Sequence, residues 1–186
     1  MEEPTEIWTV GHSRHALVDF IELLKWHNIE AVADVRRFAI SRRHPQFNEM
    51  ELFKSLAKAG VEYASFPELG GRRRPLADSP NSRWRNQSFR GYADFMLTPE
   101  FEHGIEQLLA LAAQKRTAIM CAELLWWRCH RALIADALKA RGITVTHILG
   151  VDKTEEHPYT SAARLEAGKL TYTPERNLEL ASSVGG

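Results

Sequence analysis

The chain has 186 residues, enough for one domain with a substantial hydrophobic core. Its 44% hydrophobic and 26% charged residues are typical of a soluble globular protein, and its formal net charge of zero argues against attachment to nucleic acid by bulk charge. No apolar run approaches the roughly 20 residues that span a bilayer, the acidic start is no signal peptide, and two cysteines make no disulfide framework. We therefore expect a cytoplasmic protein without a membrane segment.

Hydrophobic patterns predict strands and helices that alternate along the first 150 residues. In chain order we expect a strand over 6–10, a helix from 17 to about 26–28, a strand over 29–35, a helix over 50–59, a strand over 61–66, helices over 92–96 and 99–113, a strand over 117–121, a helix over 128–141 and a strand over 143–148. This alternation predicts an α/β fold of three layers, with a mostly parallel sheet of about five strands and helices on both faces.

Two stretches fall outside this alternation. Residues 67–91 are rich in Gly, Arg, Pro and Asn and predict a long loop, which in compact domains is usually functional or disordered. Beyond a core domain over residues 1–150, we expect a C-terminal extension over 151–186 packed on the core. It should contain a short strand over 169–173 and end in a disordered stretch, Ser182–Gly186.

Polar clusters follow the first four predicted strands. They are Gly11-His12-Ser13, Asp34-Val35-Arg36, Glu68-Leu69-Gly70-Gly71-Arg72 and Cys121-Ala122-Glu123. Parallel strands end at the same edge of a sheet, and ligands of open α/β folds bind beyond that edge. The four clusters are therefore expected to converge on one site.

Anion binding is one chemistry that these clusters suggest. Gly11 and the Gly70-Gly71 pair suit tight turns whose backbone N–H groups can point at an anion, unless they are turn residues only. Ser13 could add a hydroxyl donor, and Arg36 with one arginine of 72–74 could clamp the anion. Ten arginines and two lysines lie between residues 36 and 90 against five acidic residues, which could equally form a solvated basic surface.

The second cysteine opens a further set of alternatives. In a helix over 128–141, Cys129 and His130 would begin the buried face, close to Cys121 and Glu123. Cys121 could be a nucleophile, with Arg128 or Arg131 holding an anionic group. Some of Cys121, Glu123, Cys129, His130 and His12 could instead hold a metal, although no Cys-x-x-Cys spacing occurs. In the third interpretation both cysteines are small buried apolar side chains, which is favoured for Cys129.

Seven short motifs occur in a fixed order along the chain. They are Thr9-Val10-Gly11-His12-Ser13, Asp34-Val35-Arg36, Ser41 to Asn48, Glu68 to Arg72, Cys121-Ala122-Glu123, Cys129-His130-Arg131 and His147-Ile148. Together they resemble the bacterial and archaeal family called domain of unknown function 488, over about residues 7–149. The resemblance implies a compact α/β domain with a shared polar cluster and names no substrate. Ala39 departs from the family pattern, where proline is expected.

A looser similarity links the strand-Cys-loop-Arg-helix order to rhodaneses and cysteine phosphatases. Their active cysteine opens a loop that cradles an anion at a helix N-terminus. Here six residues separate Cys121 from Arg128, one more than in the phosphatase pattern; none is glycine, and Glu123 would repel an anion. Fold-level analogy alone therefore carries little weight for phosphatase or sulfurtransferase activity.

These observations predict an enzyme, a hydrolase or transferase using Cys121 or Glu123, that acts on a small phosphorylated or nucleotide-like ligand at the carboxyl edge of the sheet. The expected catalytic residues are Cys121, Glu123, His130 and Asp34. The expected ligand-binding residues are His12, Ser13, Arg36, Gly70, Gly71, Arg72, Arg128 and Arg131, with no metal. The alternative is a module that binds a nucleotide or nucleic acid without catalysis, through the arginine-rich loop. The sequence identifies neither a cofactor nor an oligomeric state.

Overall fold

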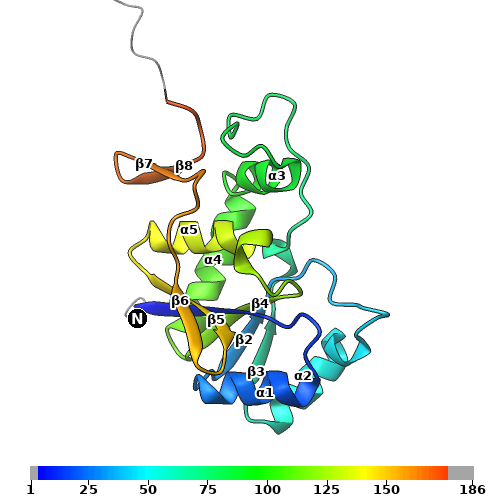
Figure 1. Cartoon of the computed structure of the whole chain (residues 1–186). Helices are drawn as coiled ribbons and strands as arrows, with labels where there is room; N and C mark the ends of the chain where they lie inside the picture. Colours follow the sequence, from blue (N-terminus) through cyan, green and yellow to red (C-terminus); the bar gives the residue numbers. More distant parts are fainter. Residues whose placement is uncertain (1–3, 176–186) are drawn as a thin grey trace, which may run out of the picture.

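A computed structural model describes residues 4–175 of the chain (Figure 1). The predicted disordered stretch Ser182–Gly186 lies outside these residues. The elements are β1 (Glu6–Gly11), α1 (Leu17–Trp26), β2 (Ala31–Asp34), α2 (Glu49–Lys58), β3 (Glu62–Ser65), α3 (Gln87–Phe95), α4 (Pro99–Ala112), β4 (Thr117–Cys121), α5 (Arg131–Lys139), β5 (Thr144–Gly150), β6 (Lys153–Glu156), β7 (Arg164–Glu166) and β8 (Lys169–Thr171). Short 3₁₀ helices lie at Pro45–Phe47, Pro67–Leu69 and Trp126–Arg128.

The main sheet has six strands in the order β3-β2-β4-β1-β5-β6. The first five are mutually parallel, and β6 adds an antiparallel edge. The register pairs Gly11 with Cys121, and Asp34 with both Met120 and Ser65. The ends of β1, β2, β3 and β4 therefore meet at one edge, which confirms the mostly parallel sheet predicted from the sequence.

Helices cover both faces of the sheet and form the three layers (Figure 1). Alternate residues of β4 face opposite sides, because successive side chains of a strand point in opposite directions. Ala118 and Met120 pack with α1 and α2, whereas Ile119 and Cys121 pack with α3, α4 and α5. The sulfur of Cys121 thus lies on the side of the sheet that α5 covers.

Several elements differ from the prediction. The sheet has six strands instead of about five, because β6, with the sequence Lys-Thr-Glu-Glu, lacks the apolar residues that mark a buried strand. The first part of the predicted extension thus joins the main sheet, and β7 pairs with the predicted strand β8.

The start of α5 is the correction that matters most for the site. The helix begins at Arg131 rather than at residue 128, since Trp126 is buried and stacks on His147 in a 3₁₀ turn that delays the helix. Cys129 consequently has an extended backbone and precedes the helix, and His130 is its N-cap residue.

The long segment predicted as a loop over 67–91 is shorter and anchored. Its last five residues belong to α3, which begins at Gln87. The carboxylate of Asp94 on α3 accepts hydrogen bonds from the Leu76 amide and from the side chains of Ser79 and Asn81. In residues 4–175 no helix is long and apolar enough to cross a membrane.

Candidate functional site

Two adjoining cavities open at the carboxyl edge of the sheet. The inner cavity, of about 290 Å³, is lined by Arg36, Arg37, Phe38, Ile40, Gly71, Arg72, Cys121, Ala122, Glu123, Cys129 and His130. The outer cavity, of about 710 Å³, is lined by His12, Ser13, Arg14, Arg36, Phe38, Ile40, Ser41, Arg43, His44, Arg72, Ala122, Glu123, Leu124, Leu125 and Arg128. Because six residues line both, the two cavities share one wall and form one site.

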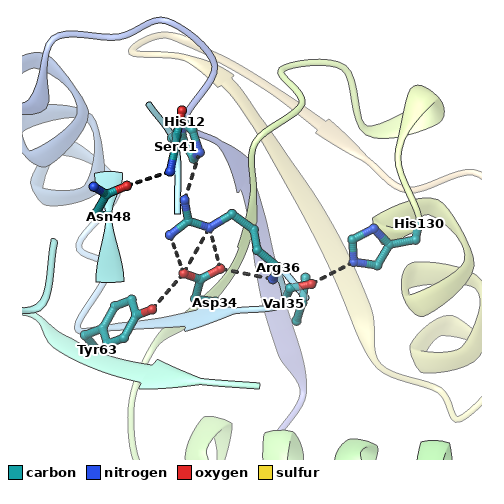
Figure 2. A network of polar contacts seen from close by, with 8 residues as sticks. All are labelled: His12, Asp34, Val35, Arg36, Ser41, Asn48, Tyr63 and His130. Atoms are coloured by element: carbon teal, nitrogen blue, oxygen red, sulfur yellow. Dashed lines mark hydrogen bonds and ion pairs between the residues drawn. The ribbon is translucent and has the colours of Figure 1, made fainter. Parts of the chain in front are cut away.

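A support cluster of His12, Asp34, Arg36 and Tyr63 underlies this wall (Figure 2). The buried carboxylate of Asp34 accepts hydrogen bonds from the backbone N–H and guanidinium of Arg36, at 2.6–3.0 Å, and from the Tyr63 hydroxyl at 2.7 Å. Burial disfavours the charge of Arg36, but its hydrogen bonds to Asp34 outweigh this and raise its pKa. Asp34 is therefore occupied as an anchor for Arg36 and lines neither cavity.

His12 completes the support cluster as a neutral ring. Its Nδ1 donates to the carbonyl of Ser13 at 3.1 Å, so its Nε2 accepts from the Arg36 guanidinium at 3.3 Å. Burial and the neighbouring charge of Arg36 lower the pKa of His12 to about 4. The ring also stacks on Phe47, which fixes its orientation.

A sulfur cluster of Cys121, Cys129, His130 and Arg131 lies on the other side of the inner cavity. The Sγ atoms of Cys121 and Cys129 are 2.7 Å apart, and the Cys121 sulfur accepts from the Glu123 amide at 3.3 Å. Cys121 ends β4 and is 2% exposed, and Cys129, two residues before the start of α5, is 5% exposed. One thiol thus comes from the end of a strand and the other from the segment that leads into α5.

Arg131 brings a positive charge into this cluster without a carboxylate partner. Its side chain is buried, and it donates to the carbonyls of Glu123 and Leu124 and to the Thr9 hydroxyl. Its Nε has no hydrogen-bond partner, and within residues 4–175 no acidic side chain forms an ion pair with it. A buried charge is costly unless it is compensated, so a thiolate beside it is favoured.

The two thiols respond in opposite ways to these surroundings. Burial opposes ionisation of Cys129, but the hydrogen bond from the Cys121 thiol and the charge of Arg131 lower its pKa to about 6. Burial and the hydrogen bond to Cys129 raise the pKa of Cys121 well above its usual range. Cys129, which precedes the N-cap residue of α5, is therefore the thiolate of the pair.

His130 faces Cys129 from the opposite side. Its Nε2 donates to the carbonyl of Val35 at 2.9 Å, as Figure 2 shows, and its Nδ1 lies 3.4 Å from the Cys129 sulfur. Burial lowers the pKa of His130, so the ring is neutral and Nδ1 is free to accept a proton. Gly71 permits this placement, because a Cβ at that position would lie 2.8 Å from Nδ1.

A buried chain of hydrogen bonds supports Arg131 from behind. Arg131 donates to Thr9 Oγ1, Thr9 donates to His147 Nδ1, His147 Nε2 donates to His157 Nδ1, and His157 Nε2 donates to Asp136. The bond to Asp136 sets the direction of the others, because a carboxylate only accepts and a neutral imidazole has one donor and one acceptor. Burial and the neighbouring His157 lower the pKa of His147 to about 2, in keeping with its neutral state.

Two glycines act through close approach instead of through turns. A Cβ at Gly11 would lie 1.9 Å from the carbonyl oxygen of Glu123, and one at Gly70 would lie 2.6 Å from the backbone of Arg37. The left-handed backbone expected of glycine at this edge occurs at Ser13 and Arg72, with φ of 47° and 60°. Such conformations cost energy in residues with a side chain and cluster at functional sites.

The mouth of the outer cavity is basic. Arg14, Arg43, Arg72 and Arg128 line it and are exposed, and among the described residues no carboxylate forms an ion pair with any of them. Glu123 is the only acidic residue in the described lining of either cavity. Arginines without partners are suited to bind a phosphate or carboxylate from solvent.

Most of the predicted site residues meet around the two cavities. Those that line them are His12, Ser13, Arg36, Gly71, Arg72, Cys121, Glu123, Arg128 and His130. Asp34, Gly70 and Arg131 lie behind the walls as supports. No group of three His, Cys, Asp or Glu side chains that could hold a metal ion occurs in residues 4–175.

Sequence reasoning missed residues that have no local signal. Cys129, Phe38 and Ile40 are absent from the predicted site residues. Cys129 lines the inner cavity, and Phe38 and Ile40 line both cavities while 65% and 80% exposed. An apolar side chain that stays exposed at a cavity mouth is a signal for ligand contact, but exposure cannot be read from the sequence.

A comparison with family models matches residues 16–138 to the family described as Domain of unknown function DUF488. The chain belongs to the DUF488 family. The matched region contains the sulfur cluster and the Asp34, Arg36 and Tyr63 members of the support cluster, so the family extends over most of the site. Thr9 and His12 precede it, and His147 and His157 follow it. The chain matched no curated protein and no solved structure.

Proposed function

We propose that the two cavities form the active site of a hydrolase or transferase that acts on a small phosphorylated or nucleotide-like ligand, with Cys129 as the nucleophile. The observation that carries this proposal is the buried Arg131, which has no carboxylate partner among the described residues and lies beside the thiols of Cys121 and Cys129 at the wall of an open cavity. Of the two thiols, Cys129 is the one whose pKa is lowered. A cytoplasmic setting, which keeps thiols reduced, suits this chemistry.

The outer cavity supports binding of the anionic part of the ligand. Arg72 and Arg128 are exposed there without carboxylate partners among the described residues, whereas Arg36 is held by Asp34 and Arg131 by backbone carbonyls. We assign the phosphate contacts to Arg72 and Arg128. Phe38 and Ile40 would cover an apolar or planar part of the ligand, because both line the shared wall.

The inner cavity supports the chemical step. The Cys129 thiolate would form a bond to the electrophilic atom of the ligand, and the leaving group would depart with the bonding electrons and take up a proton. The leaving group takes this proton from water, and the Glu123 carboxylate, which lines both cavities, would accept the proton of the water or acceptor that attacks next. Water or an acceptor would then release the group from sulfur and regenerate the thiolate.

The test combines phosphate release with binding. Purified protein is incubated with para-nitrophenyl phosphate and with adenosine mono-, di- and triphosphate, and phosphate release is measured. We expect release that falls by at least about 10³-fold in Cys129→Ser, as for loss of a nucleophile. We also expect the affinity for these compounds, measured by calorimetry, to fall about tenfold in each of Arg72→Gln and Arg128→Gln.

Arg42→Gln is the matched control, because Arg42 is exposed in the same basic region but lines neither cavity. Binding that survives with no release would favour the module without catalysis. The arginine-rich loop is less suited to bind nucleic acid than the sequence suggests. Arg73, in the middle of residues 72–74, is held by the carbonyls of Glu68 and Gly70 and lies over the Phe95 ring. If the protein neither binds any of these compounds nor releases phosphate from them, the proposal is contradicted.

A further inference from the structure

Cys121 and Cys129 are placed as a pair whose sulfurs are in contact. The sulfurs belong to different elements, lie 2.7 Å apart and both face the inner cavity. A disulfide needs a separation of about 2.05 Å, so a displacement of well under 1 Å would join them. Packing alone does not explain the pair, because apolar packing would not place an arginine without a carboxylate partner beside two thiols.

We propose that Cys121 and Cys129 form a reversible disulfide when a small hydroperoxide enters the inner cavity, and that this bond switches the site off. The sulfur chemistry stands without any ligand, whereas the loss of turnover rests on the proposed function. The geometry gives the two cysteines different roles. Cys129, beside Arg131 and the helix N-terminus, reacts first, and Cys121 resolves the product.

The reaction balances with the hydroperoxide as the oxidant. The Cys129 thiolate attacks the outer oxygen of the peroxide, the sulfur–oxygen bond forms and the oxygen–oxygen bond breaks. The alkoxide or hydroxide that leaves takes up a proton, and Cys129 becomes a sulfenic acid. Cys121 then gives up its proton and its sulfur bonds to the Cys129 sulfur, while the sulfur–oxygen bond breaks and water leaves. The two cysteines together lose two electrons, which reduce the peroxide to an alcohol or water, and to one further water.

The surroundings make the disulfide easy to reduce again. The reduced pair is stabilised by the charge of Arg131, and forming the disulfide removes the negative charge that compensates it. A dithiol whose thiolate form is stabilised yields a more oxidising disulfide. The bridge would also close only the short loop over residues 122–128, so it gains less from restricting the unfolded chain than a bridge across a long loop does.

The experiment treats the reduced protein with hydrogen peroxide and maps the cysteines by peptide mass spectrometry. We expect a Cys121–Cys129 cross-link in which both thiols are lost together and which dithiothreitol reverses. Cys129→Ser should react at least about tenfold more slowly at its remaining thiol. Cys121→Ser should accumulate a sulfenic acid at Cys129, trapped by dimedone, because the resolving thiol is absent.

Thermal unfolding of oxidised and reduced protein gives a second measurement that needs no variant to fold. We expect the oxidised protein to have the lower Tm, because its Arg131 has lost its counter-ion. Thiols that resist peroxide, an equally fast reaction in Cys129→Ser, or an oxidised protein with a clearly higher Tm would each overturn the proposal. If the cross-link forms in a protein that shows no phosphate release even when reduced, the proposed function fails while the sulfur chemistry stands.

Discussion

The support cluster and the sulfur cluster face each other across the inner cavity, and each contains a buried arginine. In the support cluster, Arg36 is matched by the carboxylate of Asp34 through several hydrogen bonds. In the sulfur cluster, the partners of Arg131 among the described residues are carbonyls and a hydroxyl, with two thiols nearby. A charge that is already paired builds rigid structure, whereas a charge left without a carboxylate activates the group beside it. The contrast separates the supporting wall from the wall that we propose to be reactive.

We expect the largest loss of stability from a substitution that breaks the support cluster. Asp34→Asn should lower the free energy of unfolding by about 3–5 kcal/mol, because it leaves the buried charge of Arg36 without its partner. Urea unfolding measures the change. Asp78→Asn, at an exposed carboxylate of the anchored loop, is the control and should stay within about 0.5 kcal/mol. Equal effects of the two variants would show that the Asp34–Arg36 pair is not the anchor we describe.

The next effect acts where β1 meets the loop of the sulfur cluster. Gly11→Ala would place a Cβ 1.9 Å from the backbone oxygen of Glu123, to which Arg131 also donates. We expect a loss of about 2–3 kcal/mol by thermal or urea unfolding, at the upper end of overpacking, because a backbone cannot rotate away like a side chain. Gly150→Ala, where the nearest atom is 3.8 Å away, should cost little, and a similar cost at both positions would argue against the close approach.

The pH dependence of stability tests one histidine of the support cluster, His12, and one of the hydrogen-bonded chain behind Arg131, His147. Unfolded, His12 and His147 protonate near 6.5, whereas the fold lowers their pKa values to about 4 and about 2. Between these values the unfolded state holds more protons. The free energy of unfolding is therefore unaffected by these rings above pH 6.5 and falls as the pH falls below it. The loss is about 1.4 kcal/mol per pH unit for each ring, or about 2 kcal/mol each at pH 5.

Urea midpoints measured from pH 7 to pH 5 check this slope. His12→Gln and His147→Gln should each make it shallower, the first through the support cluster and the second through the chain behind Arg131. If neither variant changes the slope, then these rings do not stay neutral in the folded protein.

We expect the smallest effect, a shift in the pKa of Cys129, from a substitution within the sulfur cluster. Arg131→Met removes the charge beside Cys129 and should raise the pKa of this thiol from about 6 by at least about one unit, equivalent to about 1.4 kcal/mol. The rate of alkylation by iodoacetamide as a function of pH reports the change at Cys129. An unchanged profile would mean that the charge of Arg131 does not sustain the thiolate.

The sequence predicted the parts of this protein that depend on local pattern. Apolar runs such as Ala118–Cys121 predicted the strands, and parallel order then placed Arg36, Arg72 and Cys121 at one edge. It did not predict that Cys129 precedes α5 or that Arg131 lies behind the cavity wall, because both depend on where the helix begins, after the 3₁₀ turn that contains the buried Trp126.

Contacts between distant segments leave no local pattern either. Asp136, His147 and His157 come from α5, β5 and the segment after β6, and nothing in their spacing predicts that they form one hydrogen-bonded chain. Edge strands such as β6 are similarly hidden, because their exposed polar residues resemble those of a loop.

The hydrogen-bonded chain behind Arg131 also limits how far this protein can be shortened without losing the supports of the sulfur cluster. Asp136 is buried and accepts hydrogen bonds from His157, Thr160 and Tyr172, all of which lie beyond the region that the family model matches. A fragment cut at residue 138 or 150 would retain every residue of the sulfur cluster yet leave that carboxylate without these donors. A shortened form of the protein that keeps the sulfur cluster and its supports would therefore have to extend from β1, which contains Thr9, to Tyr172.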